Sequence, residues 1–333
     1  MERRNFLQFS MAGLAKVAAG TTALTVAVSS AHAATINRTL YITEGYITQI
    51  TGEDIYFMGF SNSTSELNIP GDPFIIHEGD TVSVTIVNTL QTPHSFVIDG
   101  QIDSGVIEAG TTKTVTFTAT RAGTFFYYDK LNAPYNRLCG LHGPVAIMPR
   151  DSTNELYPGS PTFVKQQFWL FNDIDPIWNA MVENGNTPNT PFIPRFFTLN
   201  GLGGRPPGAP GYSDPTLNNM YDPRSYLKGS IGDRTLVRVL NAGMAQQAVH
   251  THANHMEWLT SNGQIRPDIW LKDIVPLDGN GGIVDVIFPF DPPPDAWPPV
   301  TTGTYPMHLH TEMSQTAGGG FYLFGAITDI FYV

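Results

Sequence analysis

The stretch that decides the fold is the nonapeptide YPMHLHTEM at residues 305–313. Two of its histidines, His308 and His310, stand two positions apart at the end of a run with the composition of a β-strand. Because side chains alternate between the two faces of a strand, both point to one side, about 6–7 Å apart. The same spacing occurs upstream at His250 and His252. Two strand-borne His-x-His pairs predict the walls of a metal site, and scattered surface histidines are the alternative reading.

The composition favours a protein of many short strands. The 333 residues suffice for two ordinary domains, and 32 glycines and 26 prolines accompany abundant Thr, Val, Ile, Phe and Tyr. The formal net charge of -11 argues against nucleic acid and anionic membranes as partners. The single cysteine, Cys139, excludes an intrachain disulfide.

The N-terminus has the pattern of an export signal. Arg3 and Arg4 precede an Ala/Val/Thr-rich run, which Lys16 interrupts and which ends in the small-x-small sequence AHA at residues 31–33. This pattern predicts a twin-arginine signal peptide over residues 1–33 rather than a lone membrane helix. We therefore expect a periplasmic or secreted protein with no membrane span after removal of the signal.

Strand signals recur at intervals of about ten residues, which predicts an all-β sandwich or barrel. One unit has Gly79-Asp80, a strand of alternating apolar and polar residues, and then Asn88. Gly232-Asp233 begins a second such unit, which ends at Asn241. The chain therefore reads as a duplicated β-domain, with a first domain over residues 35–150, a linker over 151–161 and a second domain over 162–333.

These motifs resemble the multicopper oxidase superfamily. The resemblance rests on the two Gly-Asp units, the run AGTFFYY at residues 122–128, the sequence FTLNG at 197–201 and the two His-x-His pairs. It implies two cupredoxin-like Greek-key β-sandwich or barrel domains, as in the small two-domain laccases and the copper nitrite reductases. It also implies a homotrimer that holds copper between the first domain of one subunit and the second domain of its neighbour.

The copper ligands that the resemblance implies are only partly present. Four His-x-His motifs surround the family's copper cluster. Only the leading histidine of the first motif is matched, the second motif falls on Tyr128-Asp129-Lys130, and the third and fourth are matched in full. The implied set suits one or two copper ions, and zinc also accepts histidine ligands. Its members are His94, His250, His252, His308 and His310.

The family's blue copper site is not matched in the second domain. Its cysteine position holds Leu309, and its two histidine positions hold Gln247 and Ser314. Leucine cannot supply the thiolate that makes such a centre a fast electron-transfer site. The residues Cys139, His142 and Met148 offer a copper site in the first domain as an alternative. Cys139 as a buried apolar residue and Met148 as a core residue is the simpler interpretation.

Without a blue copper, a small substrate must reach the remaining copper directly, with O2 as a candidate. This predicts an exported copper oxidoreductase. Tyr128 is a candidate weak ligand or redox partner, or else a packing residue. Asp99 and Asp129 are candidate proton donors or acceptors, or else turn carboxylates. A non-catalytic copper-binding or copper-handling protein and a structural module with vestigial histidines are the alternatives.

Overall fold

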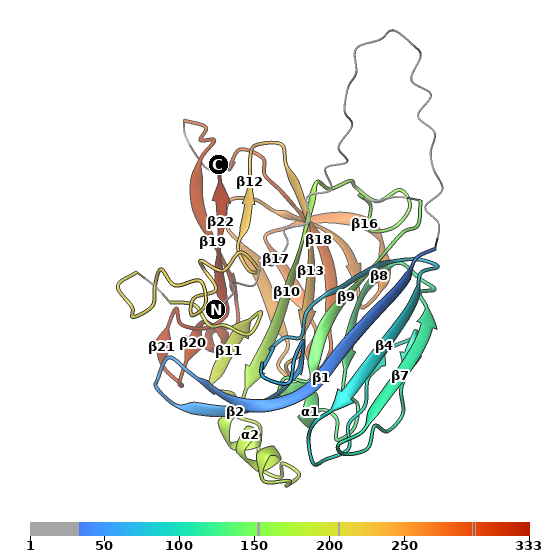
Figure 1. The fold of residues 1–333 in the computed structure, drawn as a ribbon. Coiled ribbons are helices and arrows are strands. Elements are labelled where there is room, and N and C mark those ends of the chain that lie inside the picture. Colours follow the sequence, from blue (N-terminus) through green and yellow to red (C-terminus); the bar gives the residue numbers. More distant parts are fainter. Residues whose placement is uncertain (1–32, 152–153, 206, 295, 297) are drawn as a thin grey trace.

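The computed structural model describes residues 33–151, 154–205, 207–294, 296 and 298–333. The protein is built almost entirely from β-strands, arranged as two sandwiches that pack side by side (Figure 1). The prediction of an all-β fold with two sandwich domains is confirmed. The predicted signal peptide falls on residues 1–33, of which residues 1–32 lie outside the described part of the chain.

Two sheets form the N-terminal sandwich. One has the order β2-β1-β4-β7, with β1 (Thr35–Thr48), β2 (Asp54–Ser61), β4 (Thr81–Asn88) and β7 (Thr112–Thr118). The other has the order β3-β9-β8-β5-β6, with β3 (Phe74–His77), β5 (Val97–Ile98), β6 (Ile102–Asp103), β8 (Gly123–Tyr128) and β9 (His142–Met148). A short helix, α1 (Tyr135–Leu138), precedes β9.

Two larger sheets form the C-terminal sandwich. The eight-stranded sheet has the order β16-β15-β18-β13-β10-β11-β20-β21. Its strands are β10 (Lys165–Ile174), β11 (Phe196–Leu199), β13 (Arg234–Asn241), β15 (Met256–Ser261), β16 (Gln264–Lys272), β18 (Ile283–Pro289), β20 (Thr316–Ala317) and β21 (Phe321–Tyr322). The other sheet has the order β12-β22-β19-β14-β17, with β12 (Leu227–Gly229), β14 (Gln247–Thr251), β17 (Ile274–Leu277), β19 (Gly303–Leu309) and β22 (Ile327–Tyr332).

The first Gly-Asp unit forms the turn and strand that its sequence predicts. Gly79 has a φ of +80°, a left-handed conformation that favours glycine, and the Asp80 carboxylate accepts a bond from the His77 amide. In the following strand, β4, Val82, Val84 and Ile86 are buried, whereas the residues between them are partly exposed. Alternation in the sequence therefore becomes one core-facing side of a sheet.

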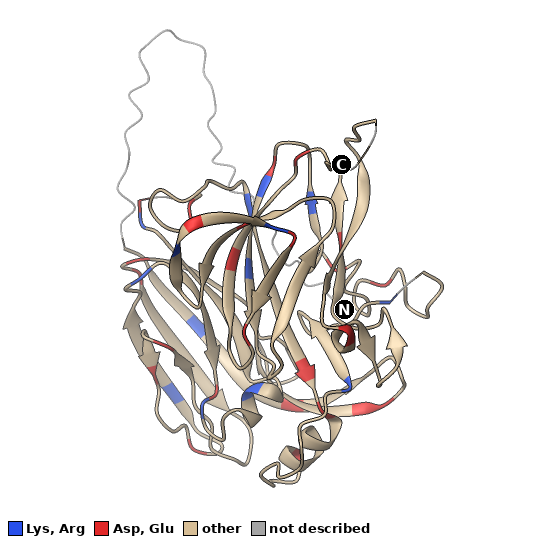
Figure 2. Ribbon diagram, turned by 180° about the vertical axis from the view of Figure 1, so that it is seen from behind, with Lys and Arg blue, Asp and Glu red and all other residues tan. Residues whose placement is uncertain are grey.

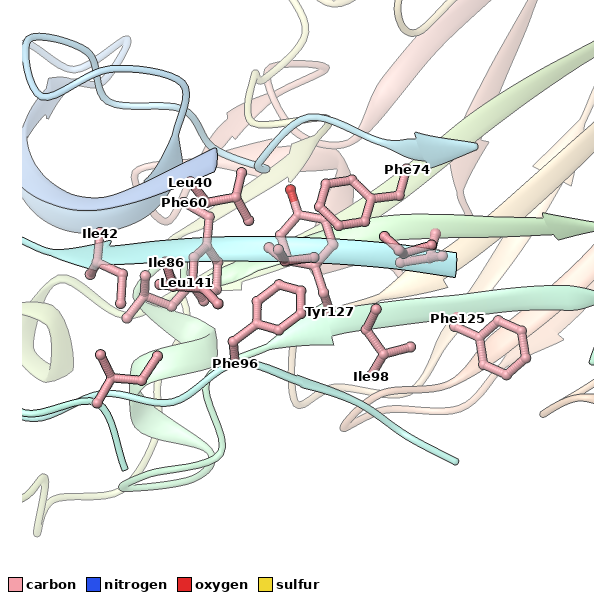
Figure 3. Packing of buried hydrophobic residues seen from close by; sticks show 14 of the residues in the cluster. Leu40, Ile42, Phe60, Phe74, Ile86, Phe96, Ile98, Phe125, Tyr127 and Leu141 are labelled. Atoms are coloured by element: carbon pink, nitrogen blue, oxygen red, sulfur yellow. The ribbon is translucent and has the colours of Figure 1, made fainter. Parts of the chain in front are cut away.

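Aromatic rings fill the N-terminal core (Figure 3). Tyr127 from β8 lies at the centre, with its ring centroid 4.9 Å from that of Phe74 and 5.6 Å from that of Phe96. Phe60 from β2 meets the Tyr127 ring edge-on at 5.5 Å. These contacts hold the two sheets of the sandwich against each other.

Strand β9 joins the two sandwiches because it is buried on both faces. Val145 and Ile147 belong to the N-terminal core. Ala146 and Met148 point the other way and pack with residues of the C-terminal sandwich, among them Leu236. Because both faces of β9 are buried, its sequence does not alternate between apolar and polar residues.

A buried polar network crosses the same interface. Arg238 of β13 is fully buried and donates from Nη1 to the Thr124 hydroxyl of β8 at 2.7 Å. The hydroxyls of Thr124 and Thr260 in turn donate to the Asp285 carboxylate. Burial lowers the pKa of Arg238 to about 10, and the Asp285 charge opposes that shift. The network thus connects strands from both sandwiches.

Helix α2 (Pro176–Glu183) lies against β2 (Figure 1) and was not predicted. Its local signal is Asp175, whose carboxylate accepts from the amides of Ile177 and Trp178, followed by proline at the first helical position. In the described part of the chain, no helix has the length and apolar character needed to cross a membrane. Figure 2 shows acidic and basic residues dispersed over both sandwiches.

Candidate metal centre

Strand register brings the two His-x-His pairs together. Strands β14 and β19 pair antiparallel, with His250 directly opposite His308. Their neighbours Val249, Met307 and Leu309 belong to the C-terminal core. Because side chains alternate along each strand, the histidines project from the outer face of this sheet, away from the core. We call the outward group formed by His250, His252, His308 and His310 the histidine cluster.

The rings of the histidine cluster are close enough to share an ion. The His250 centroid lies 4.4 Å from that of His252, 5.0 Å from that of His308 and 5.1 Å from that of His310. One ligand nitrogen each from His250, His252 and His308 lies within 4.8 Å of the others. The Nε2 atoms of His252 and His308 are 3.3 Å apart. Two nitrogens bound tetrahedrally at about 2.0–2.1 Å stand about 3.3–3.4 Å apart, so this pair fits a metal ion.

The electrostatics keep these imidazoles available as ligands. Burial, followed by the neighbouring histidines, lowers the pKa of His250 to about 4, and burial also lowers the pKa of His308. A neutral ring has a lone pair for a metal. The buried His250 Nδ1 has no hydrogen-bond partner. In His308, Nδ1 donates to the Leu309 carbonyl at 3.1 Å, which directs the Nε2 lone pair toward the cluster.

Leu309, Gln247 and Ser314, at the positions matched to the family's blue copper ligands, are buried in the protein interior. Leu309 is in the C-terminal core. Gln247 is buried, and the fully buried Ser314 donates its hydroxyl to the Thr311 carbonyl. Gln247 Oε1 has no hydrogen-bond partner. None of these side chains is a thiolate or an imidazole.

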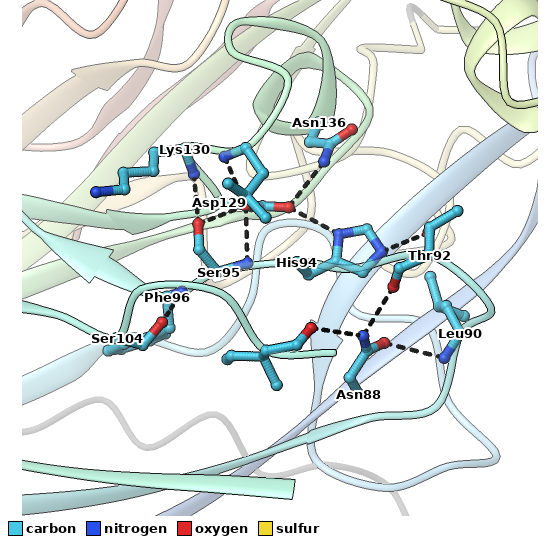
Figure 4. A network of polar contacts seen from close by, with 12 residues as sticks. Asn88, Leu90, Thr92, His94, Ser95, Phe96, Ser104, Asp129, Lys130 and Asn136 are labelled. Atoms are coloured by element: carbon cyan, nitrogen blue, oxygen red, sulfur yellow. Dashed lines mark hydrogen bonds and ion pairs between the residues drawn. The ribbon is translucent and has the colours of Figure 1, made fainter. Parts of the chain in front are cut away.

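His94 is not part of the histidine cluster, and Figure 4 shows it between Thr92 and Asp129. It precedes β5 in the N-terminal sandwich, and its side chain is 2% exposed. Its Nδ1 donates to Asp129 Oδ2 at 2.7 Å, and its Nε2 lies 3.0 Å from the Thr92 hydroxyl. A carboxylate on Nδ1 is typical of metal-ligating histidines. Here, however, both ring nitrogens already have protein partners. Of the five predicted ligands, His250, His252 and His308 bring their ligand atoms within 4.8 Å of one another, the His310 ring lies 5.1 Å from that of His250, and His94 is elsewhere.

Asp129 anchors this second group. Its carboxylate is fully buried and accepts from His94 Nδ1, from the amide and hydroxyl of Ser95, from the Leu131 amide and from Asn136 Nδ2, at 2.6–2.9 Å. Five donors from four residues fix the carboxylate in place. Thr92 and Asn136 were not predicted, although Thr92 is two residues before His94 and Asn136 is seven residues after Asp129.

Tyr128 and Asp99 form a separate, more exposed pair. The Tyr128 hydroxyl donates to Asp99 Oδ1 at 3.0 Å. Burial and the Asp99 carboxylate raise the pKa of Tyr128 to about 12, so the phenol keeps its proton at neutral pH. The three predicted catalytic residues thus belong to two sets of contacts in the N-terminal sandwich.

Cys139, His142 and Met148 face different surroundings. Cys139 lies in the N-terminal core, and burial raises the pKa of its thiol. His142 is fully buried, and its Nδ1 donates to the Arg137 carbonyl at 2.7 Å. Met148 packs at the interface between the sandwiches, where Arg238 donates to its sulfur. Among the His, Cys, Asp and Glu residues that the structure describes, only the histidine cluster brings three ligand atoms together.

Known proteins resemble this chain in part of the sequence and in the fold. Residues 61–152 match the sequence profile of the family described as Multicopper oxidase. This part of the chain is therefore similar to a multicopper oxidase domain. The copper-containing nitrite reductase of Alcaligenes xylosoxydans xylosoxydans is 22% identical over 223 residues, which are 59% of this chain and 62% of that protein. That of Cereibacter sphaeroides is 31% identical over 120 residues, which are 33% of this chain and 31% of that protein.

A solved blue copper oxidase extends the likeness of fold. The blue copper oxidase from Nitrosomonas europaea superposes with a TM-score of 0.69 at 20% identity, covering 89% of this chain and 85% of that one. The sequence matches to the two nitrite reductases, by contrast, cover less than two thirds of those proteins. The profile match also ends at residue 152, so the multicopper oxidase profile includes His94 and Asp129 but not the histidine cluster.

Proposed function

We propose that this chain is an exported copper-dependent oxidoreductase whose copper is held by His250, His252, His308 and His310. The observation that carries the proposal is the convergence of these rings on the outer face of one sheet, with the His252 and His308 Nε2 atoms 3.3 Å apart. Imidazole suits copper, and the family relatives named above are copper proteins. One or two ions are consistent with four ligands, and zinc is the competing metal.

The surroundings of the histidine cluster favour direct contact with a small substrate. Copper supplies one-electron redox chemistry when bound. His252 and His310 are exposed, so a small molecule or O2 can approach from solvent. Leu309 occupies the position of the family's electron-transfer cysteine and faces the core. A thiolate relay from a protein electron donor is therefore not part of this proposal.

Metal analysis and electron paramagnetic resonance of the exported protein test the proposal. We expect at least one copper ion per chain with a spectrum that lacks blue copper absorption. His252→Ala and His308→Ala should each weaken copper binding by at least about 100-fold, because each removes a ligand. His255→Ala is the matched control, since His255 is an exposed histidine three residues beyond His252. Equal copper binding by all three variants would contradict the assignment.

Turnover distinguishes the candidate functions. Oxygen uptake with a phenol, or reduction of nitrite, that His308→Ala abolishes would support an oxidoreductase. Copper exchange with a chelator but no turnover would support a copper-handling protein, which the exposure of His252 and His310 favours as the second candidate. Absence of bound copper and zinc in the exported protein would leave a structural module.

The homotrimer is also a proposal, supported by the outward direction of the histidine cluster. A neighbouring copy placed over this face would cover the exposed rings and offer further ligands. His94 is buried with both ring nitrogens engaged, so it could contribute only after the Thr92 segment moves. Sedimentation of the copper-loaded protein tests the assembly, and a stable copper-loaded monomer would contradict it.

A further inference from the structure

The backbone nitrogen of Ala34, the first residue after the predicted signal peptide, contacts a buried carboxylate. Ala34 N lies 2.9 Å from Asp80 Oδ1, and Asp80 is only 3% exposed. The Thr81 amide donates to the Ala34 carbonyl at 2.8 Å, and the parallel pairing of β1 with β4 begins at Thr35 opposite Thr81. This nitrogen is therefore held in place by the sheet, whereas Ala33 and Ala34 are themselves exposed.

One other cation, the guanidinium of Arg150, lies near the carboxylate of Asp80. Its Oδ2 accepts the His77 amide at 2.8 Å, and the His77 ring is 3.8 Å away. Arg150 Nη2 is 3.5 Å from Oδ1, outside the range of a strong charge-assisted bond. Of these two contacts of Oδ1, the one to Ala34 N is the shorter.

The second Gly-Asp unit shows a cation at the equivalent position. Asp233 Oδ2 accepts the Ser230 amide at 3.0 Å, as Asp80 accepts that of His77 three residues before it. Strand β10 pairs parallel with β13 from Lys165 opposite Thr235, and Lys165 Nζ lies 3.5 Å from Asp233. Lys165 lies opposite the second residue after Asp233, and the residue opposite the second residue after Asp80 is Ile36, which has no charge. The cation near Asp80 is instead Arg150, also at 3.5 Å.

We propose that cleavage between Ala33 and Ala34 places a second cation against Asp80. A signal-processing peptidase adds water to this peptide bond; Ala33 leaves as a carboxylate with the signal, and the Ala34 nitrogen gains a proton to become an ammonium. That ammonium stays against Asp80 Oδ1 and forms an ion pair that is closer than the one with Arg150. The inference rests on the proposed export. Maturation thus stabilises the N-terminal sandwich.

Two mature chains test the pairing. One begins at Ala34 and the other has the neutral extension Ser-Gly-Ser before Ala34, which keeps the amide donor but moves the amine away. In urea near pH 6.5, we expect the ratio of folded to unfolded protein to be about fivefold larger for the chain that begins at Ala34 than for the extended chain. The reason is that a charge-assisted hydrogen bond replaces a neutral one. Asp80→Asn should abolish the difference between the two chains.

The pH dependence provides a second measurement if Asp80→Asn fails to fold. An α-amine has an ordinary pKa of about 7.7–8.0, which a carboxylate partner raises. The extra stability is fully present below the unfolded pKa and is lost as the pH rises through the folded pKa. His77 and Arg150, which also face Asp80, are common to both chains. Acetylation of the Ala34 amine near pH 7 should also be slower than acetylation of the extended chain's amine.

The outcomes separate export from pairing. An exported protein whose first residue, by mass spectrometry, is not Ala34 would overturn the cleavage site. Equal stability of the two chains from pH 6 to 10, with equal acetylation rates, would overturn the ion pair. Neither result depends on copper or on turnover, so failure of the proposed oxidoreductase leaves both measurements interpretable.

Discussion

Replacing Asp129 with alanine is expected to destabilise the protein by about 4–6 kcal/mol. The substitution removes an acceptor for five bonds and leaves donors of His94, Ser95, Leu131 and Asn136 in a buried site. Each buried donor without a partner costs about 1–3 kcal/mol, and water entering the vacated space recovers part of the sum. The expected loss is comparable to the whole stability of many domains, which is about 5–15 kcal/mol.

Two substitutions calibrate that value. Asp129→Asn keeps the shape of the side chain and one acceptor oxygen, so we expect it to lower the free energy of unfolding by about 2 kcal/mol. Asp99→Ala removes an exposed carboxylate that accepts a single hydrogen bond, from Tyr128. We expect it to lower the free energy of unfolding by less than about 1 kcal/mol. Urea unfolding followed by tryptophan fluorescence measures all three. A cost for Asp129→Ala no larger than that for Asp99→Ala would refute the reasoning.

The same variants test whether His94 belongs with the copper ligands. Because His94 and Asp129 contact each other in the N-terminal sandwich, folded Asp129→Asn should retain the copper affinity of the unmodified protein. A loss of copper similar to that in His308→Ala would show that His94 acts as a ligand after all.

Three further predictions concern the rest of the fold. Arg238→Ala should cost about 3–5 kcal/mol in urea unfolding, since it leaves the buried Thr124–Asp285 network without its cation; a cost below about 1 kcal/mol would contradict this. Burial raises the pKa of Asp173 to about 6, above its ordinary 3.8, so its contribution to stability is present below about pH 4 and is lost as the pH rises through about 6; Asp173→Asn should remove this step from the pH profile. Gly243→Ala should cost at least about 1–3 kcal/mol, because the new Cβ would lie 1.3 Å from Asp173 Oδ1; unchanged unfolding would show that the turn can shift.

Local pattern was sufficient to predict the sandwich fold. The two Gly-Asp turns are each followed by a strand of period two, and β4 buries one residue in two as that pattern requires. Helix α2 was missed although Asp175 and Pro176 are local signals for a helix start. Strand β9 could not be read in this way, because its second buried face depends on a partner sheet.

The candidate site was predictable in part. His-x-His spacing places each pair on one side of a strand, but only the register of β14 with β19 sets His250 opposite His308. The position of His94 followed from the family motif alone. Its partner Thr92 is two residues away, whereas Asp129 reaches it only because segments distant in sequence pack together, and no spacing along the chain encodes that second contact.

The burial of β9 on both faces determines how the protein would behave if it were split into two fragments. Val145 and Ile147 pack in the N-terminal core, whereas Ala146 and Met148 pack against the C-terminal sandwich. An isolated N-terminal fragment would therefore expose the apolar face of β9 to solvent. Such a fragment would aggregate when made alone. If the two parts of the chain were synthesised together as separate polypeptides, they would reassemble, because β9 would again pack against the C-terminal sandwich.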